Sequence, residues 1–347
     1  MLPVEQKDVK NVSKRAILII LFAVILLLVI FGVYFIHAGN NNRSPASPEN
    51  GGGVRQIHVE DCRIADEDGN TVQLTGMSSH GLLWFPEYSN ANAMKTLKSY
   101  GANTYRIAMY ADDVGGGYVQ QKEETMRLAY MAIENAISAD MYVIVDWHVL
   151  RDENPLKNQE NAVAFFEEIS SHYGDCPNIL YEICNEPNGS ATWDDIYSYA
   201  NTVIPVIRSH APNAIVIVGT PDYSYSVEKV FDKPLDFENV MYSFHFYAGQ
   251  FGEHYNEVFD RCKKNHIPVF VTEWGINYGA NGKAALSQGK TFVTVLNRRK
   301  ISWTAWSLCN KDEVFSAIKP DCGKFSNWEL DDLTDVGNAE AHARARR

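Results

Sequence analysis

The chain has 347 residues, of which 46% are apolar and 12% are aromatic, and its formal net charge is −12. This length and apolar content fit one large globular domain of roughly 250–300 residues with additional segments. The acidic balance argues against nucleic acid as a partner, because binding to phosphates requires a basic surface.

Residues 16–36 contain no charged side chain and are mostly apolar or aromatic. Their number is close to the roughly 20 residues that a helix needs to cross a bilayer, and it exceeds the roughly 7–15 residues of a signal-peptide apolar region. Four basic residues lie within residues 1–15, whereas Arg43 alone follows soon after the apolar run. The positive-inside rule therefore predicts a cytoplasmic tail, a transmembrane signal-anchor helix and an extracellular domain. Cleavage near Ala38 and Gly39 is the alternative, and it would give a secreted protein.

Residues 37–53 are rich in Asn, Ser, Pro and Gly, which predicts a flexible linker. The six cysteines are scattered along the chain, without the close pairs that are typical of a zinc site. We therefore predict no metal site, and we assign no disulfide pairing.

A repeated alternation of strands and helices begins after the linker. Residues 54–72 alternate in polarity and contain Asp68-Gly69-Asn70, which predicts a hairpin that closes the bottom of the domain. Residues 91–100 carry apolar side chains at helical spacing and are followed by Gly101, a residue typical of a helix end. Eight strands are predicted at residues 74–81, 102–110, 141–149, 179–187, 214–220, 240–248, 267–275 and 301–308.

Eight short apolar strands separated by helices predict an α/β fold, the (β/α)8 TIM barrel. We place this barrel at residues 54–335 and a C-terminal tail at residues 336–347. A doubly wound open sheet is the rival fold, but no Gly-x-Gly-x-x-Gly turn follows the first strand. In a TIM barrel, the C-terminal ends of all the strands meet at one face, which carries the active site.

Two predicted strands end in a carboxylate. The fourth strand ends in Asn185-Glu186-Pro187, and the seventh ends in Glu273 followed by Trp274. Two carboxylates on separate strand ends are what cleavage of a glycosidic bond requires, one as proton donor and one as nucleophile or base. Glu182 lies earlier in its strand, so we interpret it as a hydrogen-bonded carboxylate inside the barrel.

Other polar and aromatic residues at the strand ends fit the same chemistry. Arg106 could hold the nucleophile charged, and Asn185 could bond the 2-hydroxyl group of a sugar. Tyr247 and His245 could position the nucleophile and the acid. Each residue also has a structural interpretation on its own, such as an ion pair or core packing, but the set as a whole favours a catalytic site.

Six short motifs occur in the order that is typical of one enzyme family. The motifs are Asn103-Thr104-Tyr105-Arg106, Asp146-Trp147-His148, Tyr181-Glu182-Ile183-Cys184-Asn185-Glu186-Pro187, Ser243-Phe244-His245-Phe246-Tyr247, Val271-Thr272-Glu273-Trp274-Gly275 and Trp303-Thr304-Ala305-Trp306-Ser307-Leu308. With these motifs the chain resembles glycoside hydrolase family 5, in particular its bacterial-type endoglucanase (cellulase) branch.

The resemblance implies an endo-β-1,4-glucanase that cuts cellulose or related β-glucans by a retaining mechanism without a cofactor. It implies that Glu186 is the acid/base and Glu273 the nucleophile, with carboxyl groups about 5–5.5 Å apart. It adds Arg106, His148, Asn185, His245 and Tyr247 to the catalytic group. It also implies substrate-binding roles for His80, Trp84, Tyr110, Trp306, Lys311 and Glu313, and stacking at a plus subsite for Trp193.

Two alternatives remain open at this stage. A β-mannanase or another β-glycanase could use the same barrel and the same two carboxylates. A surface carbohydrate-binding protein on an inactive hydrolase scaffold would be expected to lack one carboxylate, whereas both are present. A barrel aldolase is less consistent with the sequence, because no Lys stands at a strand end as a Schiff-base nucleophile.

Overall fold

The structure is a computed structural model, and it describes residues 53–344. The predicted cytoplasmic tail, the transmembrane segment and all but the last residue of the linker lie outside these residues. Within the described range, no helix combines the length and apolar character needed to cross a membrane.

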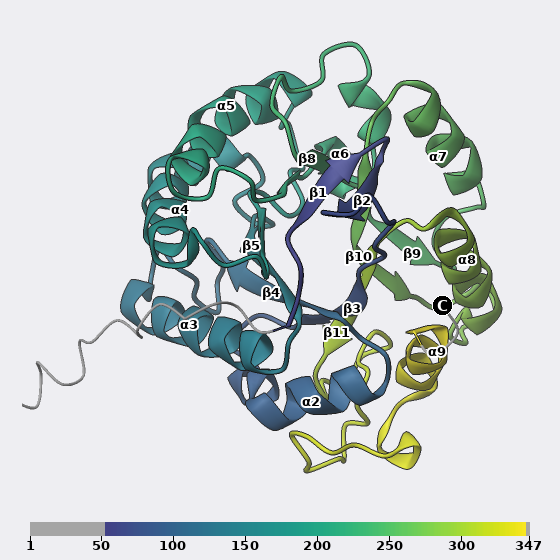
Figure 1. The fold of residues 1–347 in the computed structure, drawn as a ribbon. Helices are drawn as coiled ribbons and strands as arrows, with labels where there is room; N and C mark the ends of the chain where they lie inside the picture. The colour runs from purple at the N-terminus through teal and green to yellow at the C-terminus, as the bar shows by residue number, and fades with distance from the viewer. Residues whose placement is uncertain (1–52, 345–347) are drawn as a thin grey trace, which may run out of the picture. The chain divides into compact units, whose positions relative to one another are not determined.

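The predicted (β/α)8 barrel is confirmed, because eight parallel strands pair in chain order and the eighth pairs with both the seventh and the first (Figure 1). The eight strands are β3 (Thr75–Ser79), β4 (Thr104–Tyr110), β5 (Tyr142–His148), β6 (Ile179–Glu182), β7 (Val216–Val218), β8 (Val240–Ser243), β10 (Val269–Ile276) and β11 (Trp303–Leu308). A short strand, β9 (Phe246–Ala248), follows β8 after a two-residue interruption and also pairs with β10.

Helices surround the barrel and cover the outer face of its strands (Figure 1). They are α2 (Ala91–Ser99), α3 (Lys122–Ser138), α4 (Gln159–Tyr173), α5 (Trp193–His210), α7 (Tyr255–Lys264), α8 (Leu286–Arg299) and α9 (Asp335–Arg344). The short α6 (Pro221–Ser224) instead follows the C-terminal end of β7, where Ser224 donates a hydrogen bond to the carbonyl of Asn185. Short 3-10 helices occur at η1 (Pro86–Ser89), η2 (Pro155–Asn158), η3 (Val227–Val230) and η4 (Leu330–Asp332). In α3, Met126, Ala129, Ile133 and Ala136 recur at helical spacing and are all buried, which explains why this segment forms a helix on the sheet.

A hairpin of β1 (Ile57–Glu60) and β2 (Arg63–Asp66) lies across one end of the barrel (Figure 1). Its turn contains Asp61 and Cys62, both with positive φ, which the sequence did not predict. The turn predicted at residues 68–70 is also present, and it brings Thr71 into an antiparallel bridge with Ala65 of β2. Residues 68–70 form a separate loop, because the Asp66 carboxylate accepts hydrogen bonds from the backbone N–H groups of Asp68 and Asn70.

The barrel interior changes from apolar to polar along the strands. At the hairpin end, a buried apolar cluster contains Ile57, Ile64, Leu74, Tyr142, Ile144, Leu180, Ile215, Ile217, Met241 and Phe270. Two residues further along its strand, Ile144 is followed by Asp146 and Leu180 by Glu182, both fully buried. Because alternate residues of a strand face the same side, these carboxylates point into the barrel above the apolar layer.

Strand β10 turns two consecutive side chains inward. Its register with β11 shifts between Val271 and Trp274, which is typical of a β-bulge. Thr272 and Glu273 therefore both bond groups inside the barrel, while the Trp274 ring packs 5.8 Å from the Phe292 ring of α8.

The barrel extends beyond the boundary predicted at residue 335. Residues assigned to a C-terminal tail form α9, in which Val336 and Ala341 are buried, and Asn297 of α8 donates a hydrogen bond to the carbonyl of Ala343 at 3.2 Å. The small residues of α9 gave too weak an apolar pattern to predict this helix from the sequence. All six cysteines of the chain are free.

Glu340 of α9 is fully buried, and neither of its carboxylate oxygens has a hydrogen-bond partner within residues 53–344. Burial raises the pKa of Glu340 to about 8, although the charge of Arg344 opposes this. This pKa exceeds the pKa of the same glutamate in the unfolded chain. The free energy of unfolding therefore falls as the pH rises from the ordinary glutamate range towards 8.

We expect Glu340→Gln to increase the free energy of unfolding by an amount on the order of 3 kcal/mol at pH 8 and by little at pH 4.5. Urea unfolding at the two pH values measures this difference, with the exposed residue Glu257 changed to Gln as a matched control. Equal effects of Glu340→Gln at both pH values would contradict the predicted ionisation.

Candidate active site

Arg106 lies at the centre of the polar layer and is fully buried. Its guanidinium contacts three carboxylates: Nε donates to Glu182 Oε2 at 2.7 Å, Nη1 to Glu273 Oε2 at 3.0 Å, and Nη2 lies 2.9 Å from Asp146 Oδ2. Burial alone would lower the pKa of Arg106, but the three carboxylates together raise it above its ordinary value. One permanent cation therefore orients carboxylates from three different strands.

Glu182 is held on both oxygens. Arg106 Nη2 donates to Oε1 at 3.2 Å, and Thr272 Oγ1 donates to the same oxygen at 2.7 Å. Burial raises the pKa of Glu182, which the nearby Arg106 charge opposes. Glu182 thus occupies the internal, hydrogen-bonded place expected from its position in the strand.

Glu273, the predicted nucleophile, is almost completely buried and is held by two donors. Arg106 bonds Oε2, and the Tyr247 hydroxyl donates to Oε1 at 2.5 Å. Burial and then the charge of Glu273 raise the pKa of Tyr247 well above its usual value, so this hydroxyl keeps its proton and remains a donor. Both bonds favour an ionised, oriented Glu273.

Glu186, the predicted acid, has a different environment. Its Oε1 lies 2.8 Å from His245 Nδ1, and the guanidinium of Arg106 makes no hydrogen bond to it among the described residues. Burial, with a smaller contribution from Asp146 and Glu182, raises the pKa of Glu186 to about 8 against the opposing charge of Arg106. Glu186 therefore holds a proton at neutral pH.

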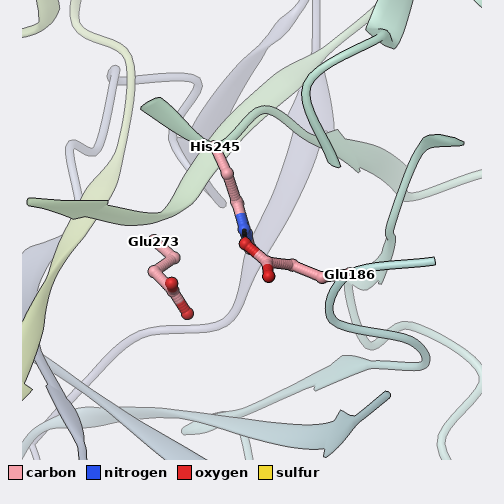
Figure 2. Close-up of side chains that lie close together, drawn as sticks. All are labelled: Glu186, His245 and Glu273. Carbon is pink, nitrogen blue, oxygen red and sulfur yellow. Dashed lines mark hydrogen bonds and ion pairs between the residues drawn. The ribbon is translucent and has the colours of Figure 1, made fainter. Parts of the chain in front are cut away.

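Glu186 and Glu273 face one another from separate strand ends (Figure 2). An oxygen of each carboxylate and one nitrogen of His245 all lie within 4.8 Å of one another. This spacing fits the about 5–5.5 Å between carboxyl groups in a retaining mechanism, and it is shorter than the roughly 6.5–9.5 Å of an inverting one. The same three atoms could approach a metal ion, but their hydrogen bonds to each other, to Arg106 and to Tyr247 already account for them.

His148 and Asn185 form a second hydrogen-bonded pair beside Arg106. His148 Nδ1 lies 2.6 Å from Asp146 Oδ2, and its Nε2 lies 3.3 Å from Asn185 Nδ2. Burial, reinforced by Arg106, lowers the pKa of His148 well below its usual range, so its ring is neutral. Asn185 Oδ1 accepts from Arg106 Nη2 at 2.6 Å, which leaves the amide nitrogen turned towards His148.

Aromatic rings line the same end of the barrel. The Trp306 ring lies 5.4 Å from that of His148, nearly parallel, and 5.3 Å from that of His80. The Tyr110 ring lies 4.6 Å from that of Trp84, edge to face. These rings form an apolar wall next to the carboxylates, suited to the flat face of a sugar.

Lys311 and Glu313 lie beside this wall, where the resemblance placed them. Lys311 Nζ is 2.7 Å from Glu313 Oε2, and Glu313 Oε1 is 3.8 Å from His80 Nε2. Burial, together with the charge of Lys311, lowers the pKa of His80 to about 3. His80 is thus neutral and offers hydrogen bonds rather than charge.

Trp193 has contacts that differ from those of the other predicted aromatic site residues, and its stacking on a sugar stays a prediction. It begins α5, its side chain is buried, and its indole N–H donates to the carbonyl of Lys233 at 2.8 Å. Its ring packs 5.8 Å from the Tyr242 ring. Trp193 therefore holds a helix against the barrel, which its sequence position did not distinguish from a binding role.

Sequence reasoning missed Ser243 and Thr272 as members of the site, and it did not recognise Asp146 as a partner of Arg106. Ser243 Oγ lies 3.2 Å from Glu182 Oε1 and 2.9 Å from Thr272 Oγ1. A signal was present for two of them, because Asp146 and Ser243 each lie two residues before a predicted site histidine on the same strand face. Thr272 lies two residues after Phe270, whose side chain is in the interior cluster, so ordinary alternation turns Thr272 inward and the bulge in β10 adds Glu273 beside it.

Comparison with known proteins shows a consistent set of relatives. The family described as Cellulase (glycosyl hydrolase family 5) matches residues 65–312. An endoglucanase from Clostridium saccharobutylicum is 37% identical over 94% of the chain, and endoglucanase A from Butyrivibrio fibrisolvens is 40% identical over 81% of it. The chain spans 71% and 66% of the lengths of these two relatives.

Solved structures show the same similarity. The catalytic domain of the Thermobifida fusca endoglucanase Cel5A, in complex with cellotetraose, superposes with a TM-score of 0.78 at 31% identity. That match covers 84% of the chain and 97% of the other. The alkaline cellulase K catalytic domain superposes with a TM-score of 0.76 at 31% identity, covering 87% and 96%.

The contacts of Arg106 lead to a prediction about stability. Arg106→Met leaves Asp146, Glu182 and Glu273 buried without their cation, so we expect the free energy of unfolding to fall by about 3–5 kcal/mol at pH 8. Loss of the cation raises the folded-state pKa values of Asp146 and Glu182, and the loss of stability should therefore be smaller at pH 5.

Urea unfolding at both pH values measures the effect. Arg127→Met is the control, because the surface pair of Arg127 with Glu124 is exposed and should contribute less than about 1 kcal/mol. A deficit for Arg106→Met that is no larger than that of the control would show that the buried network does not depend on this cation.

Proposed function

Because the chain belongs to glycoside hydrolase family 5, the cellulase family, we propose that it is a retaining endo-β-1,4-glucanase that hydrolyses internal bonds of cellulose or related β-glucans. This membership confirms the resemblance found in the sequence motifs. The observation that carries the mechanism is the pair of carboxylates within 4.8 Å, one protonated at Glu186 and one bonded to Arg106 and Tyr247 at Glu273.

The first step forms a covalent intermediate. A Glu273 oxygen attacks the anomeric carbon, the bond from that carbon to the leaving oxygen breaks, and the proton of Glu186 passes to the leaving oxygen. Arg106 and Tyr247 hold the Glu273 carboxylate in place before the attack through hydrogen bonds to its two oxygens. Asn185 supplies an amide next to the reacting ring, where a bond to the 2-hydroxyl would strengthen in the transition state.

The second step reverses the role of Glu186. Having lost its proton, Glu186 accepts one from water, and the resulting hydroxide oxygen bonds the anomeric carbon as the ester to Glu273 breaks. Two displacements at one carbon restore its original configuration, so the first product is the β-anomer.

The aromatic wall supports a β-glucan as the substrate. Trp84, Tyr110 and Trp306 offer ring faces and edges next to the carboxylates, and Lys311, Glu313 and His80 add polar groups beside them. β-1,4-Linked glucose units expose flat apolar faces that match such a wall. The endoglucanase relatives and the cellotetraose complex of a similar catalytic domain support the same substrate class.

Hydrolysis of cellopentaose by the chain tests this function. We expect the β-anomer to appear first by NMR, and Glu273→Ala and Glu186→Ala each to lower kcat by about 10²–10⁴-fold or more. A dinitrophenyl cellobioside separates the roles, because its leaving group needs no proton: Glu186→Ala should still form the glycosyl-enzyme with it, whereas Glu273→Ala should not.

Glu160→Ala, which changes an exposed carboxylate in the first turn of α4, is the matched control and should retain full activity. If the enzyme cleaves mannopentaose but leaves cellopentaose intact, it is a β-mannanase on the same barrel and not a glucanase. Binding of cellopentaose without cleavage would instead support a carbohydrate-binding protein. Appearance of the α-anomer first would overturn the retaining mechanism.

We further propose that residues 16–36 anchor the enzyme as a single-pass membrane protein, with residues 1–15 in the cytoplasm and the barrel outside the cell. The uncharged length of this segment and the basic residues before it support this arrangement. We expect the full chain to stay in the membrane fraction after a high-salt wash and the chain from Val54 to be soluble. Release into the medium of a shortened chain that begins near Gly39 would favour cleavage near Ala38 and a secreted enzyme.

A further inference from the structure

A continuous line of hydrogen bonds joins the buried carboxylate of Glu182 to the predicted acid. Thr272 Oγ1 donates to Glu182 Oε1 at 2.7 Å, His245 Nε2 lies 2.9 Å from Thr272 Oγ1, and His245 Nδ1 lies 2.8 Å from Glu186 Oε1. Glu182, Thr272 and His245 are all at most 2% exposed. Water is thus kept from the three residues that precede Glu186 in this line.

The direction of each bond follows from the first one. Arg106 donates to both oxygens of Glu182, which fits an ionised carboxylate that accepts and cannot donate. The Thr272 hydroxyl has one proton, and its 2.7 Å contact with Glu182 uses it. Thr272 Oγ1 can therefore only accept from His245, so His245 Nε2 carries a proton.

The hydroxyl of Ser243 does not change the direction of the hydrogen bond from Thr272 to Glu182. Ser243 Oγ lies 3.2 Å from Glu182 Oε1 and 2.9 Å from Thr272 Oγ1, so it can donate to either atom. In both cases the hydroxyl proton of Thr272 still points at Glu182 Oε1. Without that proton, the lone pairs of Thr272 Oγ1 and Glu182 Oε1 would face each other at 2.7 Å and repel.

His245 has a single ring proton. Burial lowers the pKa of His245 to about 4, so the ring is neutral at the pH at which Glu186 acts. With the proton on Nε2, Nδ1 presents a lone pair to Glu186. The 2.8 Å contact is then favourable when Glu186 is protonated and donates, and unfavourable when Glu186 is ionised.

We propose that Thr272, oriented by Glu182, is a positioning residue that fixes the Nε2–H tautomer of His245 and thereby keeps the proton on Glu186 until the leaving oxygen takes it. The inference rests on the proposed function, in which Glu186 is the acid. In this proposal, Thr272 determines whether His245 accepts a hydrogen bond from protonated Glu186 or donates one to the ionised carboxylate.

Other charged and titratable groups also act on Glu186 and His245. They are Arg106 of β4, Asp146 and His148 of β5, Glu182 of β6, Glu273 of β10, Tyr110 of β4 and Tyr247 of β9. A change at Thr272 removes one hydrogen-bond donor from Glu182, which keeps those of Arg106 and Ser243, and among the described residues it breaks no hydrogen bond to the other groups. Thr272→Val therefore isolates the tautomer of His245 from the surrounding charges.

The first test reads the tautomer itself and needs no activity. In the full chain labelled with ¹⁵N-histidine, we expect the His245 ring at pH 6 to show a protonated Nε2 and an unprotonated Nδ1. A His245→Asn variant identifies its signals among the ten histidines of the chain. A protonated Nδ1 in the unaltered protein would overturn the proposal, whether or not any variant folds.

The second test reads the pH dependence of catalysis. In Thr272→Val, Nε2 loses its acceptor, so the proton should move to Nδ1 and stabilise ionised Glu186. We expect the basic limb of the kcat/KM profile on cellopentaose to shift by about one pH unit or more to lower pH. Thr272→Ser keeps the hydroxyl and should restore the limb of the unaltered enzyme.

The leaving group separates this role from a loss of packing. With a dinitrophenyl cellobioside, glycosylation needs no acid, so Thr272→Val should form the glycosyl-enzyme at nearly the unaltered rate. A drop of equal size on both substrates, with an unshifted basic limb, would mean that Thr272 serves packing alone. If the unaltered enzyme cleaves neither substrate, the proposed function fails, while the NMR result still decides the tautomer.

Discussion

The active end of this barrel depends on one buried guanidinium. Arg106 contacts Asp146, Glu182 and Glu273 from three strands, and no water competes for its hydrogen bonds because the residue is fully buried. Three carboxylates around one cation leave an excess of negative charge in a medium that screens it poorly. Hydroxyl donors from Ser243, Thr272 and Tyr247 offset part of this excess. The remaining negative charge acts on Glu186, the next ionisable group. Burial and the acidic neighbours together raise the pKa of Glu186 to about 8.

Two glutamates of the same chemical type thereby acquire opposite roles. Glu273 receives hydrogen bonds from a permanent cation and from a phenol, and both stabilise its ionised form. Glu186 faces an imidazole that the line through Thr272 turns into an acceptor, and this stabilises its protonated form. The separation of proton donor and nucleophile is therefore set by neighbours rather than by the carboxylates themselves. Substrate recognition is built from different residues, the rings of Trp84, Tyr110 and Trp306 on one side of the carboxylates.

The position of the site follows from the fold. Below the polar layer, apolar side chains and the β1–β2 hairpin fill the interior at the hairpin end, so charged groups can lie only towards the C-terminal ends of the strands. The bulge in β10 adds a second inward side chain at the point where Thr272 meets Glu273. This small irregularity places both the nucleophile and the residue that orients His245 on one strand.

The sequence by itself determined the eight strands and the barrel, because strand polarity is a local pattern, and it predicted Glu186 and Glu273 as the two carboxylates at the polar strand ends. It also identified Arg106, His148, His245 and Tyr247, which occur in short motifs. It could not decide that Trp193 packs under a helix, that α9 completes the barrel, or that the hairpin turns at Asp61 and Cys62. Those features depend on which surfaces meet in space. The hydrogen-bond line from Glu182 to Glu186 was decided by tertiary structure alone, since its four members come from β6, the loop after β6, the interruption between β8 and β9, and β10.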